Sequence, residues 1–253
     1  MNILTTGILS GLGRYVYEHL GGLGLTRASA SRCLSAARKT GVDVIIHCAF
    51  NSSRDISSEN LYDYFRDNVG LTEELAGLTP KKFIYISSVD VYPRNSGPHT
   101  EEAILEADSI KGIYGVTKMI SEAIVKKYCK NFLILRPVTL LGRYARKNTL
   151  MRIIEGKDCS VGLSAGSRFN YALHEDVFDF IKVAIKKDLR GIYNVASSEN
   201  IILSDVARIV GRKVNFGKYL YDVGNVSNAK ISRICPAFRK SSAEALRIFL
   251  KGL

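Results

Sequence analysis

Short runs of apolar, largely β-branched residues alternate with amphipathic segments along most of the chain. The runs predict strands at Asn2–Thr6, Asp43–Ala49, Lys82–Ser88, Phe132–Arg136 and Ile192–Ala196. Their near-continuous apolar character is typical of parallel strands that are buried on both faces. The segments between them predict helices at about 12–20, 31–39, 59–76, 113–130 and 175–187. This alternation predicts an α/β fold with a doubly wound parallel (Rossmann) sheet.

The pattern becomes less regular after Pro137, which indicates a second, smaller part of the chain. We expect an NAD(P)-binding Rossmann domain over residues 1–142 and a smaller substrate-binding lobe over residues 143–253. An amphipathic helix at 241–250 ends the lobe. The stretch 167–196 is expected to return to the Rossmann sheet, so that the two parts interleave.

The composition fits a soluble α/β protein of 253 residues. It is 46% hydrophobic and 24% charged, which is ordinary for a globular protein, and no apolar run reaches the ~18 residues of a membrane span. The five cysteines lie singly, without a C-x-x-C, which fits reduced thiols better than disulfides or a zinc site. The first residues predict a strand rather than a signal peptide. We therefore expect a cytoplasmic protein without a metal.

The formal net charge of +12 predicts an anionic partner, because a positive field concentrates anions around a protein. The basic residues are dispersed along the chain and are not interleaved with aromatic residues, as they are on surfaces that stack RNA bases. This disfavours nucleic acid and leaves two interpretations, phosphorylated small molecules as partners or a charge that serves only solubility.

A glycine-rich turn follows the first predicted strand. Residues 6–13 read T-G-I-L-S-G-L-G and place Gly7, Gly11 and Gly13 between a strand and a helix. Glycines permit a tight turn and let backbone N–H groups approach a pyrophosphate, and the helix N-terminus adds partial positive charge. The spacing is not the commonest G-x-G-x-x-G, and a plain turn is the alternative. The position between strand and helix favours a dinucleotide-binding site.

The residue type after the second strand distinguishes NAD from NADP. An NAD site usually places Asp or Glu about 20 residues beyond the glycines, where it binds the adenosine ribose 2′-OH. Arg27 stands there instead, after the short run Leu23–Thr26, and Arg14 is nearby in sequence. An arginine at this place can hold a 2′-phosphate. The pattern favours NADP over NAD, with a surface arginine on a shortened strand as the alternative.

Tyr114 and Lys118 lie four positions apart in the predicted helix 113–130, so they share one face. The unperturbed pKa of tyrosine, about 10, makes it a poor base at neutral pH. A nearby ammonium can lower that pKa by about a unit or more. Tyr-x-x-x-Lys is a short pattern that also occurs in ordinary surface helices, and the pair alone leaves both interpretations open.

Several motifs, taken in order, resemble the NAD-dependent epimerase/dehydratase family of extended short-chain dehydrogenases/reductases, of the kind that works on nucleotide sugars. The resemblance covers nearly the whole chain. Its motifs are the glycine turn at 6–13, D-V-I-I-H-C-A at 43–49, N-V-G at 68–70, I-Y-I-S-S-V-D-V-Y at 84–92, Y-G-V-T-K at 114–118, L-R-P-V-T-L-L-G at 135–142 and Y-A-L-H-E-D-V at 171–177.

The resemblance implies Ser88, Tyr114 and Lys118 as the catalytic residues. Tyr114 would transfer a proton, Lys118 would favour its ionised form and bind the nicotinamide ribose, and Ser88 would align the sugar oxygen. Ala49, at the end of the second motif, would lie beside the cofactor. The resemblance also implies a homodimer packed through the helix that carries Tyr114.

The sequence departs from the family pattern in the substrate lobe. Thr139 stands where the family frequently has Asn after Arg-Pro. Arg168 is offset by one place from the family's arginine, where it would still reach a substrate phosphate. The segment from Gly13 to Asp43 is short, so the second strand and its helix are expected to be trimmed.

The tripeptide Ser88-Val89-Asp90 bears on the reaction. Dehydratases of this kind carry Asp-Glu directly after the Ser or Thr, and Val89 cannot protonate a leaving hydroxyl, which disfavours 4,6-dehydration. Epimerisation and keto-sugar reduction remain: the motif set favours an epimerase and Arg27 a reductase. Asp90 is either an additional base or a solvated carboxylate at the end of a strand.

Two other functions are compatible with the fold. One is a catalytically idle nucleotide-sensing or RNA-binding protein, since fold alone does not imply function. The intact Ser88, Tyr114 and Lys118 argue against it. The other is a reductase of an apolar ketone, which would need an apolar substrate lobe, whereas this lobe is rich in Arg and Lys.

Overall fold

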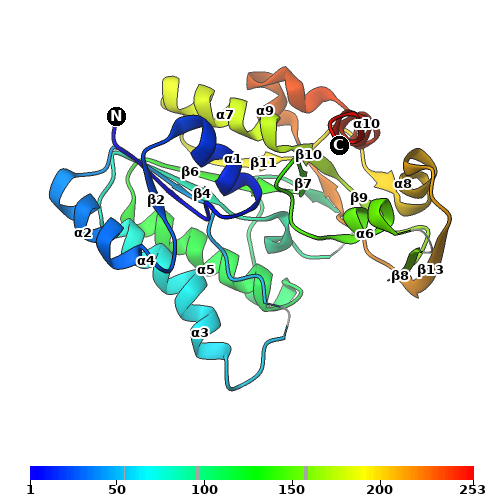
Figure 1. Cartoon of the computed structure of the whole chain (residues 1–253), viewed down its shortest axis with the longest axis horizontal. Helices are drawn as coiled ribbons and strands as arrows, with labels where there is room; N and C mark the ends of the chain where they lie inside the picture. Colours follow the sequence, from blue (N-terminus) through cyan, green and yellow to red (C-terminus); the bar gives the residue numbers. More distant parts are fainter. Residues whose placement is uncertain (54, 95–96, 157–158) are drawn as a thin grey trace.

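A computed structural model describes residues 1–53, 55–94, 97–156 and 159–253 (Figure 1). Its centre is a six-stranded sheet in the order β11-β6-β4-β3-β1-β2, in which every pairing is parallel. This confirms the predicted Rossmann-like fold class. The strands are β1 Ile3–Thr6, β2 Leu23–Leu25, β3 Val44–His47, β4 Lys82–Ile86, β6 Phe132–Pro137 and β11 Gly191–Val195.

Helices cover both faces of this sheet (Figure 1). Leu12 and Val16 of α1 share one core cluster with Val177 and Ile181 of α7. Residues of α2, α4 and α5 form the cluster on the opposite face. The helices are α1 Gly11–Leu20, α2 Ala30–Thr40, α4 Leu71–Ala76, α5 Ile113–Tyr128 and α7 His174–Lys186.

The helix predicted at 59–76 is divided. α3 Leu61–Phe65 is followed by a π-helical turn, η1 Arg66–Gly70, before α4 begins. The Asn68 side chain accepts a hydrogen bond from the backbone N–H of Asn51 at 2.7 Å and donates to the Asn51 carbonyl oxygen at 3.3 Å. Single π turns inside helices are often found at functional sites, and this one is fastened to the loop that follows β3.

A third core cluster lies beside the sheet and combines the segments after β6 with the C-terminal part of the chain. Here β7 Thr139–Leu141 pairs with β10 Tyr171–Leu173, β8 Cys159–Leu163 with β13 Val214–Tyr219, and β9 Arg168–Phe169 with β12 Ile201–Ile202. α7 and β11 return to the main sheet between these segments. The division into two domains at residue 142 stays a prediction.

The remaining elements complete the chain. They are η2 Val89–Val91, β5 Pro98–His99, η3 Ala107–Ser109, α6 Thr149–Glu155, α8 Leu203–Val210, β14 Asn225–Val226, α9 Ala229–Ile234, η4 Pro236–Arg239 and α10 Ser242–Lys251. α10 begins with a capping box between Ser241 and Glu244. In the described ranges, no helix has both the length and the hydrophobicity to cross a membrane.

Candidate active site

The glycine turn between β1 and α1 requires its glycines. Gly7 has φ +73° and Gly11 φ +60°, in the left-handed region that side chains disfavour. A Cβ at Gly7 would lie 2.8 Å from the backbone nitrogen of Ala49, and one at Gly13 would lie 2.5 Å from the carbonyl oxygen of Gly7. The turn is thus packed tightly on the end of β3, and Gly11 and Gly13 line a cleft beside it. This fits a bound dinucleotide.

The end of β3 is fastened to the end of β1. The Thr6 hydroxyl oxygen accepts hydrogen bonds from the backbone N–H groups of Cys48 and Ala49 at 3.1 and 2.9 Å. It also lies 2.7 Å from His47 Nδ1. Burial lowers the pKa of His47 to about 3, so its ring is neutral at physiological pH. These contacts fix Ala49 directly beneath the glycine turn.

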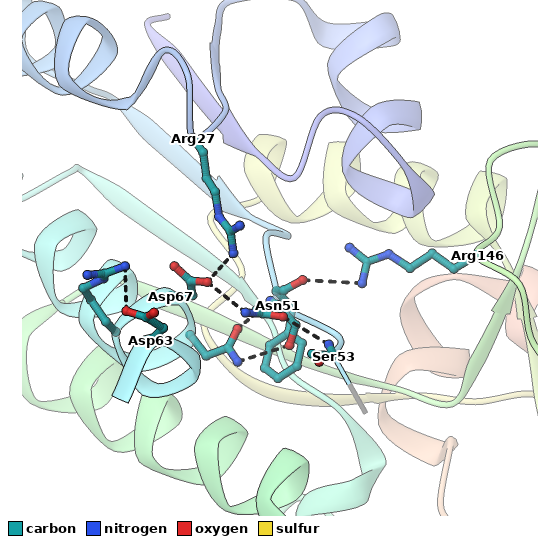
Figure 2. A network of polar contacts seen from close by, with 9 residues as sticks. Arg27, Asn51, Ser53, Asp63, Asp67 and Arg146 are labelled. Atoms are coloured by element: carbon teal, nitrogen blue, oxygen red, sulfur yellow. Dashed lines mark hydrogen bonds and ion pairs between the residues drawn. The ribbon is translucent and has the colours of Figure 1, made fainter. Parts of the chain in front are cut away.

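Residues 144–146 lie across the glycine turn. The N–H of Gly11 donates to the carbonyl oxygen of Tyr144 at 2.7 Å. Arg146 donates to the Ser10 hydroxyl at 3.3 Å. It also donates to the Phe50 carbonyl oxygen at 3.5 Å (Figure 2). The sequence indicated Arg146 only as one of many basic residues in the lobe. Its place at the turn depends on how the chain after β7 folds back, for which periodicity gives no signal.

One cleft of about 1350 Å³ brings most of the predicted site together. Its lining includes Gly11 and Gly13 from the turn, the three predicted catalytic residues Ser88, Tyr114 and Lys118, and Thr139 from β7. Basic side chains line the same cleft from the segment after β7, namely Arg146, Lys147 and Arg152. The elements come together because the carboxyl ends of parallel strands lie at one edge of the sheet.

Lys118 is buried on the face of α5 that packs on the sheet. Its ammonium donates to the carbonyl oxygen of Ile86 at 2.7 Å, at the end of β4, and lies 4.5 Å from the ring centre of Phe50. Burial lowers the pKa of Lys118 to about 7. The amine is therefore poised near neutrality between its charged and neutral forms.

Tyr114 packs edge-on against Phe50, with ring centres 4.8 Å apart. Burial raises the pKa of Tyr114 well above its ordinary value, and the negative charge of Asp90 raises it further. A hydrogen bond with Ser88 acts in the opposite direction. The expectation that Lys118 lowers the tyrosine pKa is wrong for this structure, because desolvation and the Asp90 charge dominate. The phenol is protonated at neutral pH.

Ser88 is held at the end of β4 by Asp90. The Ser88 hydroxyl oxygen accepts from the Asp90 N–H at 3.1 Å, and the hydroxyl donates to the Asp90 carboxylate at 3.2 Å. Asp90 also forms an ion pair with Arg94, which donates to the Asp222 carbonyl oxygen at 3.1 Å. The Asp90 side chain is 26% exposed, lines the cleft and connects, through Arg94, the end of β4 with the segment after β13.

A buried ion pair supports this arrangement from behind. Glu122, one turn beyond Lys118 on α5, accepts two hydrogen bonds from Arg136 on β6 at 2.9 and 2.7 Å. It also accepts one from the Ser87 hydroxyl at 2.6 Å. Both charged side chains are 0–1% exposed. The sequence analysis missed this pair, although an arginine ending an apolar strand was a signal for a buried partner.

The other predicted site residues lie outside the lining of the cleft. Arg14 pairs with Glu18 at 2.9 Å and lies over the Tyr144 ring. Arg168 is half-exposed on β9 and pairs with Asp222 at 3.5 Å. Arg27 forms an ion pair with Asp67 of η1 (Figure 2). In the described part of the chain, no group of three or more His, Cys, Asp or Glu side chains is placed to hold a metal ion.

The parallel sheet and the glycine turn define a Rossmann-like α/β protein. Within that class, the chain belongs to the NAD-dependent epimerase/dehydratase family, whose model matches residues 13–196. A comparison with curated proteins finds no match.

Solved structures of nucleotide-sugar enzymes share the fold across nearly the whole chain. One is a dTDP-4-dehydrorhamnose reductase from Clostridium acetobutylicum, with 18% identity over 99% of both chains and a TM-score of 0.80. A reductase of the same name from Bacillus anthracis, in complex with NADP, has 19% identity over 99% of both chains and a TM-score of 0.79. A mutant UDP-glucuronic acid 4-epimerase from Bacillus cereus, with a UDP-sugar and NAD, has 19% identity, covers 99% of this chain and 98% of its own, and has a TM-score of 0.78.

Proposed function

We propose that this protein is an NAD(P)-dependent enzyme that acts on a nucleotide-activated sugar, as an epimerase or as a keto-sugar reductase. The observation that carries the proposal is the single cleft lined by Ser88, Tyr114 and Lys118 and by Gly11 and Gly13 of the β1–α1 turn. The family supports it, as do the names of structures with the same fold, which include both a nucleotide-sugar reductase and an epimerase.

The side chains of the cleft suit proton transfer to a sugar oxygen. When bound, the nicotinamide would supply or accept the hydride. Tyr114 is protonated at neutral pH because burial and Asp90 raise its pKa, so it is set to give a proton to a keto oxygen. Ser88, which lines the same cleft, would hold the same oxygen. This is the half-reaction that keto-sugar reduction and the second step of epimerisation share.

Positive charge on the lobe side of the cleft suits the diphosphate of a nucleotide sugar. Arg146, Lys147 and Arg152 line it together with Thr139. Arginine and lysine bind phosphate oxygens through charge-assisted hydrogen bonds. An apolar ketone would gain nothing from these groups, which favours the nucleotide sugar as the substrate class.

The test begins with the nucleotide that co-purifies with the protein, released by denaturation and identified by mass spectrometry. The protein is then assayed with UDP-, GDP- and dTDP-sugars and their 4-keto forms, by absorbance at 340 nm and by product analysis. Turnover of one nucleotide sugar supports the proposal. Binding of NAD(P) without turnover of any of them would favour an idle nucleotide-sensing protein instead.

Two further parts of the proposal need their own measurements. We propose a homodimer packed through α5, and light scattering of the purified protein would give twice the chain mass of 28.0 kDa. We also propose a cytoplasmic location, which fractionation of cells of the source organism would test. A monomer or a membrane-fraction protein, respectively, would contradict these two statements.

A further inference from the structure

A carboxylate stands close to Arg27, although the sequence around the second strand lacks one. β2 ends at Leu25, and Arg27 follows it at the same sheet edge as the glycine turn. Asp67, from the π-helical turn η1, forms an ion pair with Arg27. Asp67 also accepts a hydrogen bond at 2.8 Å from the side chain of Asn51, which follows β3 (Figure 2). We call Arg27, Asn51 and Asp67 the outer network.

The two charges of the outer network differ in exposure. The Asp67 side chain is 20% exposed and fixed by two partners, whereas the Arg27 side chain is 79% exposed. A guanidinium has five N–H donors, and Asp67 engages one terminal nitrogen. Arg27 therefore still has donors for a phosphate, but a phosphate held there would lie near a fixed negative charge.

In this fold, an acid at the end of the second strand binds the adenosine ribose 2′-OH, and an arginine there binds a 2′-phosphate. The outer network contains both groups, on different elements. A 2′-OH bound beside the outer network would gain an acceptor from Asp67, while a 2′-phosphate would gain Arg27 and be repelled by Asp67. The two cofactors thus experience opposite contributions from one carboxylate.

We propose that Asp67 is a specificity-determining residue, which sets the choice between NADP and NAD by limiting the attraction of Arg27 for a 2′-phosphate. This inference rests on the proposed function, because it assumes that the cleft binds a nicotinamide dinucleotide. The wild-type protein then binds NADH and NADPH with affinities within about tenfold of each other. The preference for NADP that Arg27 alone predicts is correspondingly reduced.

The experiment compares dissociation constants for NADH and NADPH after co-purified nucleotide has been removed. Binding is followed by the emission of the bound dihydronicotinamide. Asp67→Asn is expected to raise the affinity ratio in favour of NADPH by about tenfold, and Arg27→Gln to lower it by a similar factor. A ratio measured on one variant is insensitive to the fraction of that sample that is folded.

The matched control is Asp63→Asn. Asp63 lies one turn before Asp67, and it pairs with Arg66 at 3.0 Å with both side chains more than half exposed. The Asp63→Asn substitution should leave the ratio of the NADPH and NADH affinities unchanged. An Asp67→Asn ratio within about twofold of both the wild-type and the control ratio would overturn the inference while leaving the proposed function intact. A wild-type protein that binds neither dinucleotide would overturn the proposed function and this inference with it.

Discussion

The catalytic end of the cleft consists of Ser88, Tyr114 and Lys118. It is held by different kinds of contact from those of the outer network. Lys118 is buried and hydrogen-bonded to the backbone at the end of β4, and the Glu122–Arg136 pair behind it is excluded from solvent. Arg27, in contrast, pairs directly with Asp67 at the surface, where its own side chain is mostly exposed. Burial therefore shifts the pKa values of Lys118 and Tyr114 and fixes the positions of the side chains at the catalytic end. In the outer network the charge of Arg27 is exposed and screened by solvent. The strength of a single charge can therefore change the preference between two related cofactors.

The largest effect is expected from Tyr114→Phe, which removes the proton that the catalytic end supplies. Turnover should fall by about 10²–10⁴-fold, the usual contribution of general acid–base catalysis. The affinity for NADH should stay within about twofold, because the phenol ring and its contact with Phe50 remain. Steady-state kinetics and fluorescence titration measure the two quantities. Activity close to that of the wild type would remove Tyr114 as the proton donor.

Glu122→Ala tests whether burial holds the catalytic end together. Removing one partner leaves Arg136 charged and buried, so the free energy of unfolding should fall by about 3–5 kcal/mol. Urea denaturation measures it. The control is Asp179→Ala on α7, whose pair with Lys182 is about half exposed and should contribute about 0–1 kcal/mol. Equal losses in the two variants would show that the buried pair has no special weight.

Lys118→Met tests the charge state at the catalytic end through pH. The folded-state pKa of Lys118 is about 7, against 10.5 for the ordinary lysine. Between these values the unfolded chain binds the extra proton, so wild-type stability rises with pH there. The stability gained by the methionine variant should be largest at pH 7 or below and should shrink towards pH 10. Urea unfolding of the cofactor-free proteins at three pH values measures this, and a difference independent of pH would contradict it.

Asp90→Asn should have the smallest effect of these substitutions. It removes the negative charge that raises the pKa of Tyr114 and keeps the shape of the side chain. The alkaline limb of the pH profile of kcat/KM should move to lower pH. An unmoved limb, with normal folding, would mean that burial alone sets the tyrosine pKa.

The fold followed from the sequence where one physical cause dominates. Strands buried on both faces need continuous apolar runs, so five strands of the main sheet were predicted within a few residues, and the sixth, β2, matches the short run at Leu23–Thr26. The division of the helix at 59–76 was not predicted. The Asn68 side chain binds the backbone of Asn51, 17 residues away, and helical periodicity carries no information about such a contact.

The candidate site likewise has features that the sequence predicted and features that it did not. Ser88 at a strand end and Tyr114 and Lys118 on one helix face line one cleft, because the parallel topology leaves little freedom. Their catalytic roles stay a prediction. The predicted lowering of the Tyr114 pKa was wrong, because burial of the phenol and the charge of Asp90 raise it. The pairing of Arg27 with Asp67 spans 40 residues, and Arg146 reaches the glycine turn from the segment after β7. Neither follows from a motif.

A single-turnover experiment tests most directly whether the catalytic end transfers hydride to a sugar. The protein, loaded with one equivalent of NADH or NADPH, is mixed with 4-keto forms of UDP-, GDP- and dTDP-sugars while absorbance at 340 nm is followed. We predict that one of them removes the absorbance of the bound cofactor in the wild-type protein and leaves it unchanged in Tyr114→Phe. Constant absorbance in the wild-type protein with every sugar, while the cofactor remains bound, would contradict the enzymatic function.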